Sequence, residues 1–492
     1  MADYIHGAYG IQNTAGSKVS QQSPMAFVVI GTAPVHQIAG GGSNVNIPKL
    51  VQNISEARSL FGYSDDWASY TLCEAMHVFF EQKAVGPLVL INVMNPATHK
   101  QAEAVTASLT PSGGQIVIAN GENVILDTVT IGTKTKGTDY EIAYNFAKKA
   151  VVATELSAGA LGSAALSVSY SVADPSAVTT TNVIGASDGE GENTGVYAVR
   201  NVYTLTGYVP SLLLAPGFSG VPAVHAAMYA NSQKIAAHWD AMIYADLPLT
   251  DGATALTLST AYSWANTNGY NKPNEKRFFP MVLGTDAKKY HLSVLAAANL
   301  LALIRENDGI PYHSSSNTAA PIIQNLYLGE DALNRVYDDE VVNQKLNKYG
   351  ITSAAYVSGQ WVIWGAHTAD YNPDSADEIN VAETNIMMLY WLTNDFQRRR
   401  SPLVDRPMTQ NDLESVVAEE QARLDALVKI GALTFGEAQL SATAISESDV
   451  FSGDYQIVFN VTTTPLAKSI TAIVNWVKTG LEIYFAGSDQ IA

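Results

Sequence analysis

Residues 25–31 read MAFVVIG, a continuous apolar run rich in β-branched side chains that begins after Pro24 and ends at a glycine. Such a run is typical of a strand that is buried in a sheet. Residues 70–80 place apolar side chains at helical spacing, and residues 88–93 (LVLINV) form a second apolar run. A strand, a helix and a strand in this order predict an α/β unit at the start of the fold.

The same alternation returns in the second half of the chain. Strands are expected at residues 208–215, 241–244 and 279–283, and helices at residues 222–237 and 288–305. We therefore predict an α/β and α+β multidomain protein, whose α/β core consists of residues 25–97 and 185–480.

Between the two parts of this core the composition changes. Residues 98–184 are dominated by Ser, Thr, Gly and Val, and apolar and polar side chains alternate at 115–118 and 165–172. Turn-forming residues close the segment at Asp174-Pro175 and again at 185–189. We interpret residues 98–184 as an inserted β-rich domain.

The predicted core ends in a helix, a strand and a second helix. Residues 408–430 form the first helix, with Thr409 as N-cap, Asp412 in the capping-box position and Gly431 as the stop. Residues 454–461 are expected to form the strand. Apolar residues then recur at helical spacing and predict a last helix that Gly480 ends; they are Leu466, Ile470, Ile473, Val474 and Val477.

Each end of the chain is predicted to be an arm. Residues 1–24 are polar, contain glycine and lack helical periodicity. Residues 481–492 begin with an alternation of apolar and other side chains at 481–485, which is typical of a short strand.

The charge of the chain limits its partners. Its 28 Lys and Arg against 46 Asp and Glu give a net charge of -18, which disfavours nucleic acid and anionic membranes. Only 15% of the 492 residues are charged. This low value fits a subunit covered by copies of itself, and equally a monomer whose surface is rich in Ser, Thr and Asn.

Targeting signals are not recognisable. Residues 1–12 lack the features of a secretory signal, and the longest mainly apolar stretch, 292–304, is too short to span a bilayer. We expect a protein that stays in the cytosol where it is made, without membrane insertion.

Each candidate for chemistry has a simpler structural interpretation, so we predict no enzyme, cofactor or metal. Residues 217–221 (GFSGV) lack the second glycine of a nucleophile elbow, and residues 40–43 (GGGS) lack the Lys of a phosphate-binding loop. The acidic run 338–340 and the nine histidines have no metal-ligand spacing. Cys73 is expected to be a buried small hydrophobe.

One cluster of positive charge stands out in this acidic chain. Arg398, Arg399 and Arg400 are consecutive, and Arg406 follows. The cluster is interpreted either as a solvated loop or as a docking face for an acidic partner protein.

The order of short motifs resembles the tail sheath protein family of contractile-tailed phages, R-type bacteriocins and related contractile injection systems. The resemblance covers nearly the whole chain and rests on segments at 30–34 (IGTAP), 48–51 (PKLV), 56–57 (EA), 61–62 (FG), 70–75 (YTLCEA), 92–93 (NV), 137–140 (GTDY), 173–176 (ADPS), 215–219 (APGFS), 309–311 (GIP), 346–347 (LN), 350–351 (GI), 364–365 (WG) and 396–400 (FQRRR).

This resemblance implies a structural subunit that polymerises helically around a tail tube and contracts to drive the tube through a cell envelope. Its partners would be further copies of itself, the tail tube protein, and baseplate and tail terminator proteins. The implied location is the tail of a virion or similar particle, assembled in the cytoplasm of the bacterial host.

The resemblance also implies where the subunit makes its contacts. Family members exchange terminal strands between neighbours, so the expected strand-exchange residues are Tyr4, Ile5, Tyr9, Ile11, Leu481, Ile483, Tyr484 and Phe485. The expected tube-facing residues are Arg398, Arg399, Arg400, Lys468 and Lys478. The inserted domain would then face outward.

Two other classes of protein remain as alternatives. Low charge and a Ser/Thr-rich β module also suit a surface-layer or adhesin subunit, although the usual secretion signal is missing. Strand and helix alternation suits an α/β hydrolase-like enzyme, although no triad, metal cage or cofactor loop is recognisable.

Overall fold

A computed structural model describes residues 24–373, 381–441 and 453–478 of the chain. At its centre lies a nine-stranded mixed sheet, in the order β17-β20-β19-β14-β11-β10-β1-β3-β2. The strands from β19 to β3 in this order run parallel, and β2, β20 and β17 are antiparallel to their neighbours. Their bounds are β1 Met25–Gly31, β2 Lys49–Val51, β3 Leu88–Asn92, β10 Val209–Leu214, β11 Met242–Asp246, β14 Glu275–Phe278, β17 Thr318–Ala319, β19 Ile351–Val357 and β20 Gln360–Trp364.

Helices cover both faces of this sheet because its strands are apolar on both sides. Phe27 and Val29 of β1 face one hydrophobic cluster, whereas Val28 and Ile30 face the other. On the first face lie α1 Ile54–Phe61, α2 Thr71–Met76 with the π-helical turn His77–Gln82, and α7 Leu292–Glu306. On the second face lie α4 Val202–Thr206, α5 Pro222–Ala230 and α6 Ala261–Thr267. The core is therefore three layers thick.

Smaller elements complete this core. β15 Met281–Gly284 pairs with β16 Lys289–Tyr290 and β18 Ile323–Tyr327, and β12 Thr250–Asp251 pairs with β13 Thr254–Ala255. Two further short helices are α3 Thr180–Ile184 and α8 Asp339–Lys345.

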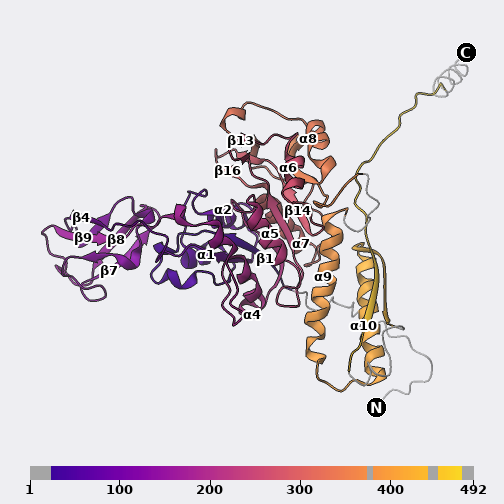
Figure 1. The fold of residues 1–492 in the computed structure, drawn as a ribbon, viewed down its shortest axis with the longest axis horizontal. Coiled ribbons are helices and arrows are strands. Elements are labelled where there is room, and N and C mark those ends of the chain that lie inside the picture. The colour runs from indigo at the N-terminus through magenta and orange to yellow at the C-terminus, as the bar shows by residue number, and fades with distance from the viewer. Residues whose placement is uncertain (1–23, 374–380, 442–452, 479–492) are drawn as a thin grey trace, which may run out of the picture.

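Residues 105–170 form two three-stranded antiparallel sheets at one end of the molecule (Figure 1). One contains β4 Val105–Leu109, β9 Leu166–Tyr170 and β6 Thr130–Ile131; the other contains β5 Gln115–Ile118, β8 Ala150–Glu155 and β7 Tyr140–Asn145. They enclose a hydrophobic cluster of their own. Tyr70 of the core donates a hydrogen bond to Asn123 at 2.6 Å, which helps to seat these sheets on the core.

At the other end of the molecule two long helices pack against a two-stranded sheet (Figure 1). They are α9 Glu383–Arg400 and α10 Gln410–Lys429, followed by β21 Leu433–Leu440 and β22 Ile457–Thr463. We call α9, α10, β21 and β22 the hairpin unit. The expected cap of α10 is confirmed, because Thr409 and Asp412 form a capping box.

The predicted fold class is confirmed, and most predicted elements lie within a few residues of their expected bounds. The helix expected at 222–237 is shorter and ends at Ala230. The strand expected at 279–283 is β15, whereas β14, with its charged sequence EKRF, was not predicted. Three consecutive charged residues on a fully buried strand do not match the hydrophobicity pattern on which such predictions depend.

The helix predicted from Leu466 onward is wrong. Residues 464–477 contain neither helix nor strand and run away from the body of the molecule (Figure 1). Ile470 and Val474 are each 92% exposed, so the apolar stripe packs against no surface formed by the described residues. Packing of an apolar face supplies most of the stability of a short helix, so the helical periodicity is not sufficient by itself.

Candidate assembly surfaces

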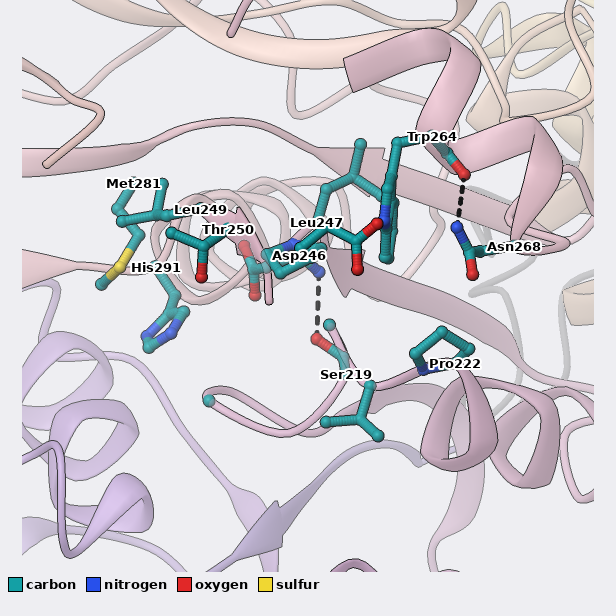
Figure 2. A pocket seen from close by; sticks show the side chains of 15 residues that line it. Ser219, Pro222, Asp246, Leu247, Leu249, Thr250, Trp264, Asn268, Met281 and His291 are labelled. Carbon is teal, nitrogen blue, oxygen red and sulfur yellow. Dashed lines mark hydrogen bonds between the residues drawn. The ribbon is translucent and has the colours of Figure 1, made fainter. Parts of the chain in front are cut away.

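The loop that follows β10 lines a cavity of about 410 Å³ (Figure 2). Ser219 in this loop is completely buried, and its hydroxyl oxygen accepts a hydrogen bond from the backbone N–H of Asp246 at 3.0 Å. The Asp246 carboxylate in turn accepts bonds from the backbone and hydroxyl of Ser293. The Asp246 carboxylate thereby binds the backbone N–H of Ser293 in the first turn of α7. Ser219 is a structural residue, as the sequence predicted.

His291 lies at the same cavity and pairs with the carboxylate of Glu74 at 2.6 Å. Burial alone would lower the pKa of His291, but the Glu74 carboxylate outweighs it and raises this pKa to about 9. The Ser219 hydroxyl bonds to Asp246 and the His291 imidazole bonds to Glu74, so among the described residues these two are not paired as the nucleophile and base of a hydrolase triad.

Other sites of chemistry are equally unsupported. Cys73 is fully buried, as predicted, and burial raises the pKa of its thiol to about 12. Within the part of the chain that the structure describes, no three His, Cys, Asp or Glu side chains cluster as metal ligands would. Nor does that part contain a helix long and apolar enough to cross a membrane.

The three consecutive arginines form the last turn of α9, so the interpretation as a solvated loop is wrong. Arg399 pairs with Asp395 at 2.5 Å and with Glu420 at 2.6 Å. Arg400 pairs with Glu420 at 2.5 Å and with Glu419 at 2.8 Å. The carboxylates come from the preceding turn of α9 and from α10, so the cluster joins the two helices.

This pairing changes how much positive charge the cluster presents. The side chains of Arg398, Arg399 and Arg400 are 22%, 15% and 16% exposed. Their partners Asp395 and Glu420 are each 1% exposed as whole residues. The sequence shows the arginine run clearly but not its neutralisation, because Glu420 lies twenty positions farther along the chain.

The other two expected tube-facing residues lie on the extended segment 464–478. Lys468 donates a hydrogen bond to the hydroxyl of Tyr371 at 2.8 Å, and Tyr371 stacks on His367. This contact anchors the start of the segment on the core. Lys478, its last residue, is exposed, as are the apolar residues Ile470, Ile473, Val474, Trp476 and Val477.

The β21–β22 sheet packs one face against α10. Gly436 comes so close to this helix that a Cβ added to it would lie 2.9 Å from Leu424 Cβ. Among the described residues, β21 and β22 pair only with each other. On β21, however, the side chain of Gln421 from α10 accepts from the backbone N–H of Ala438 and donates to the carbonyl of Gly436, so the open edge is that of β22. An open edge of this kind can accept a further strand.

The expected strand-exchange residues lie outside the described residues. They are Tyr4, Ile5, Tyr9, Ile11, Leu481, Ile483, Tyr484 and Phe485.

A buried polar network that the sequence did not predict joins the hairpin unit to the core. Glu383, at the start of α9, pairs with Lys276 of β14 at 2.8 Å, and both side chains are 0% exposed. The only sequence signal was the run of charges at 275–277 directly before the apolar segment 278–283.

No protein-family model matches the sequence. The chain is 26% identical over 487 residues to the tail sheath protein of Burkholderia phage BcepMu, and the match covers 96% of each chain. The resemblance expected from the sequence motifs is thereby confirmed.

Solved structures with the same fold come from contractile injection systems. A chain of the contracted helical sheath of the anti-feeding prophage has a TM-score of 0.53 and 14% identity, over 97% of this chain and all of that one. A chain of the contracted PVC sheath complex, an extracellular contractile injection system, has a TM-score of 0.55 and 11% identity, over 98% of this chain and 99% of that one.

Proposed function

We infer that this chain belongs to the tail sheath protein family and is a structural subunit of a contractile tail sheath, with no enzymatic activity. The observation that carries this conclusion is the match to a phage tail sheath protein along 96% of both chains. The core, the β-rich sheets and the hairpin unit all lie within the match. The similarity is therefore not limited to one domain shared with an unrelated protein. The rival interpretations as a surface-layer subunit or a hydrolase have no such support.

The subunit acts by polymerising helically with copies of itself in the sheath of a phage or injection-system particle. Contraction uses free energy stored in folding and in the contacts between subunits, so the function needs no nucleotide. The further partners that we propose are the tail tube protein, which the sheath surrounds, and the baseplate and tail terminator proteins at its two ends. Assembly would take place in the cytoplasm of the bacterial host.

Neighbouring subunits are connected, in this proposal, by strand exchange. The N-terminal residues 1–24 and the C-terminal residues 481–492 are the donors, and the β21–β22 sheet is the acceptor. The outer edge of β22 pairs with no further strand among the described residues, and residues 464–478 leave the body in an extended form. Backbone hydrogen bonds would hold the added strands while the subunits change orientation.

The tube-facing surface is proposed to lie at the hairpin unit and the segment that follows it. Of the five residues expected there, Lys468 and Lys478 are exposed. Lys468 anchors its segment to Tyr371, and Arg399 and Arg400 hold α9 against α10. We therefore assign the direct positive contact with the tube mainly to Lys478. The arginines hold the helices that carry this surface in position. The β-rich sheets at the opposite end of the molecule would face outward (Figure 1).

Negative-stain electron microscopy of the purified protein tests this function. Striated hollow tubes are the expected result, because a sheath subunit without its tube still carries its lattice contacts. Flat lattices would instead support a surface-layer protein, and discrete particles at high concentration would count against self-assembly.

A further inference from the structure

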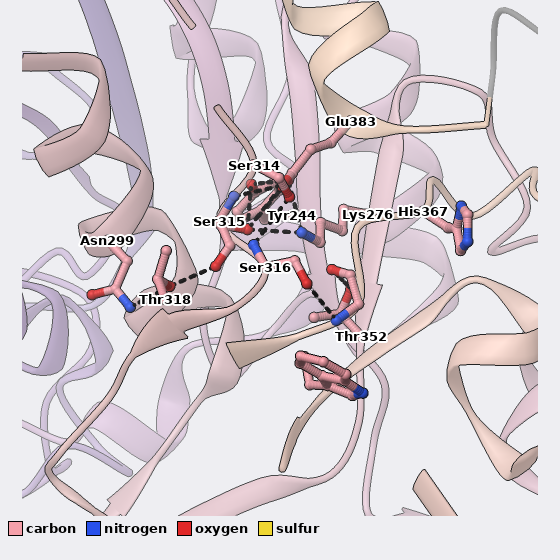
Figure 3. A network of polar contacts seen from close by, with 12 residues as sticks. Tyr244, Lys276, Asn299, Ser314, Ser315, Ser316, Thr318, Thr352, His367 and Glu383 are labelled. Atoms are coloured by element: carbon pink, nitrogen blue, oxygen red, sulfur yellow. Dashed lines mark hydrogen bonds and ion pairs between the residues drawn. The ribbon is translucent and has the colours of Figure 1, made fainter. Parts of the chain in front are cut away.

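The start of α9 carries a carboxylate that is completely surrounded by polar groups of the core (Figure 3). Glu383 pairs with Lys276 and accepts hydrogen bonds from the Tyr244 hydroxyl at 2.5 Å, the Ser314 hydroxyl at 2.5 Å and the Ser315 backbone at 2.7 Å. Lys276 also donates to the Ser315 hydroxyl at 2.7 Å. Two neighbouring strands and one loop therefore converge on a single side chain.

The Glu383 carboxyl of this network favours its ionised form although it is buried, whereas for Lys276 burial outweighs the attraction of Glu383 and lowers the pKa below its ordinary value. Burial favours the neutral carboxyl, yet the Lys276 ammonium and the hydroxyl donors outweigh it and lower the pKa of Glu383 below its ordinary value. A buried ion pair seldom stabilises a fold more than an apolar pair of the same size, because both charges lose their hydration. The presence of this ion pair is therefore not explained by stability alone.

A second buried polar contact lies on the same face of α9. Asn394 donates to the Asp240 carbonyl at 2.8 Å and accepts from the Asp240 backbone N–H at 3.0 Å. Positions 383 and 394 are about three helical turns apart, so both side chains point toward the core. Two fixed points on one face determine both the direction of a helix and its rotation about its axis.

The apolar contacts of α9 depend less on the exact rotation and position of the helix. Met387, Met388 and Leu392 face the hydrophobic clusters between the two polar contacts. Methionine is unbranched and adapts to irregular surroundings, so these residues would tolerate a small rotation or slide of the helix. A shift by one residue, about 100° of rotation, would in contrast break every bond to Glu383.

We propose that the Lys276–Glu383 ion pair is an orientation lock, which fixes the angle at which the hairpin unit leaves the core. The hairpin unit contains the open edge of β22 and precedes segment 464–478. The lock therefore fixes where these surfaces stand relative to the nine-stranded sheet. It is a property of the single chain and holds whether or not the chain forms a sheath.

The test measures the orientation directly in the isolated chain. Spin labels on cysteines at Ser263 of α6 and Ala422 of α10, both exposed, report the distance between core and hairpin unit by electron paramagnetic resonance. Native Cys73 is buried and stays unlabelled in the folded protein. The decisive variant is the neutral pair Lys276→Met with Glu383→Gln, which keeps an acceptor for the Tyr244 and Ser315 donors.

The expected result is a distance distribution at least about twice as broad as in the unaltered chain, with a Tm that changes by less than about 5 °C. The matched control is the surface pair Lys289→Met with Glu330→Gln, whose partners are 44% and 66% exposed and which should leave the distribution narrow. A narrow distribution in the neutral pair would overturn the proposal. A large fall in Tm would also overturn the proposal, whether the distance distribution is broad or narrow, because the pair would then act through stability alone.

Discussion

Arg399 donates two hydrogen bonds to the carboxylate of Glu420, at 2.6 and 2.7 Å, and so joins the last turn of α9 to α10. The same carboxylate accepts from Arg400, while Asp395 accepts from Arg399 on its other side. What looks in the sequence like a free basic patch is therefore the clamp of the hairpin unit.

Replacing Glu420 with Gln should loosen this clamp. The change removes the charge that Arg399 and Arg400 share, and breaking a buried ion pair on one side typically costs about 3 kcal/mol. Native-state hydrogen exchange of the α10 amides measures the loss as faster local opening. The matched control is Glu81→Gln, whose partner Arg58 is 36% exposed and whose effect should stay below about 1 kcal/mol. Equal effects of both changes would contradict a clamp.

Neither the clamp nor the orientation lock could be predicted from this sequence. Apolar runs such as residues 25–31 and the capping box at Thr409 are local patterns, and the structure contains them as predicted. The pairing of Arg399 with Glu420 and that of Glu383 with Lys276 are set by the packing of α9 against distant elements, which no local spacing encodes. Residues 466–477 show the reverse case, because their helical pattern is local and has no packing partner within the described chain.

Stability should fall as the pH rises from about 6.5 to about 9. Because the pKa of His291 is raised from 6.5 to about 9 in the folded chain, its protonated form stabilises the fold. This contribution is complete below pH 6.5 and is lost as the pH passes the folded pKa; a shift of this size corresponds to about 3 kcal/mol.

Thermal unfolding followed between pH 6 and pH 10 measures this loss. The variant His291→Asn should be less stable than the unaltered chain at pH 6 and should lose the decline that His291 causes. Replacing the exposed His313 with Asn is the matched control and should leave the pH profile as it was. Parallel profiles for the unaltered chain and His291→Asn would show that the Glu74–His291 pair does not contribute.

Deleting residues 1–12 should leave a folded subunit that forms no long tubes. In the strand-exchange proposal these residues complete a sheet of a neighbouring subunit, so their loss removes a lattice contact without touching the described core. Electron microscopy measures tube length, and circular dichroism checks that the fold is kept. A variant with an unrelated alternating sequence at 1–12 should recover part of the length, because the contact depends mainly on the backbone. Tubes of normal length after the deletion would contradict the arm.

Reversing the charge of Lys478 should weaken the association of the sheath with its tube. Reversal of Arg398, Arg399 and Arg400 is not a clean test, because it would place like charges beside Asp395 and Glu420 and loosen the hairpin unit. Lys478 is exposed at the end of segment 464–478, so Lys478→Glu changes the surface and leaves these ion pairs intact. Self-assembly into tubes should therefore continue.

Co-sedimentation of sheath subunits with assembled tail tubes measures this association over a range of salt concentrations. The unaltered chain should bind less as salt rises, since exposed charges are screened over about 10 Å at 0.1 M. The matched control is Lys148→Glu, another exposed lysine but one in the β-rich sheets that we place outward. If Lys148→Glu weakened tube binding as much as Lys478→Glu, the effect would follow net charge, and the proposed tube-facing surface would be wrong.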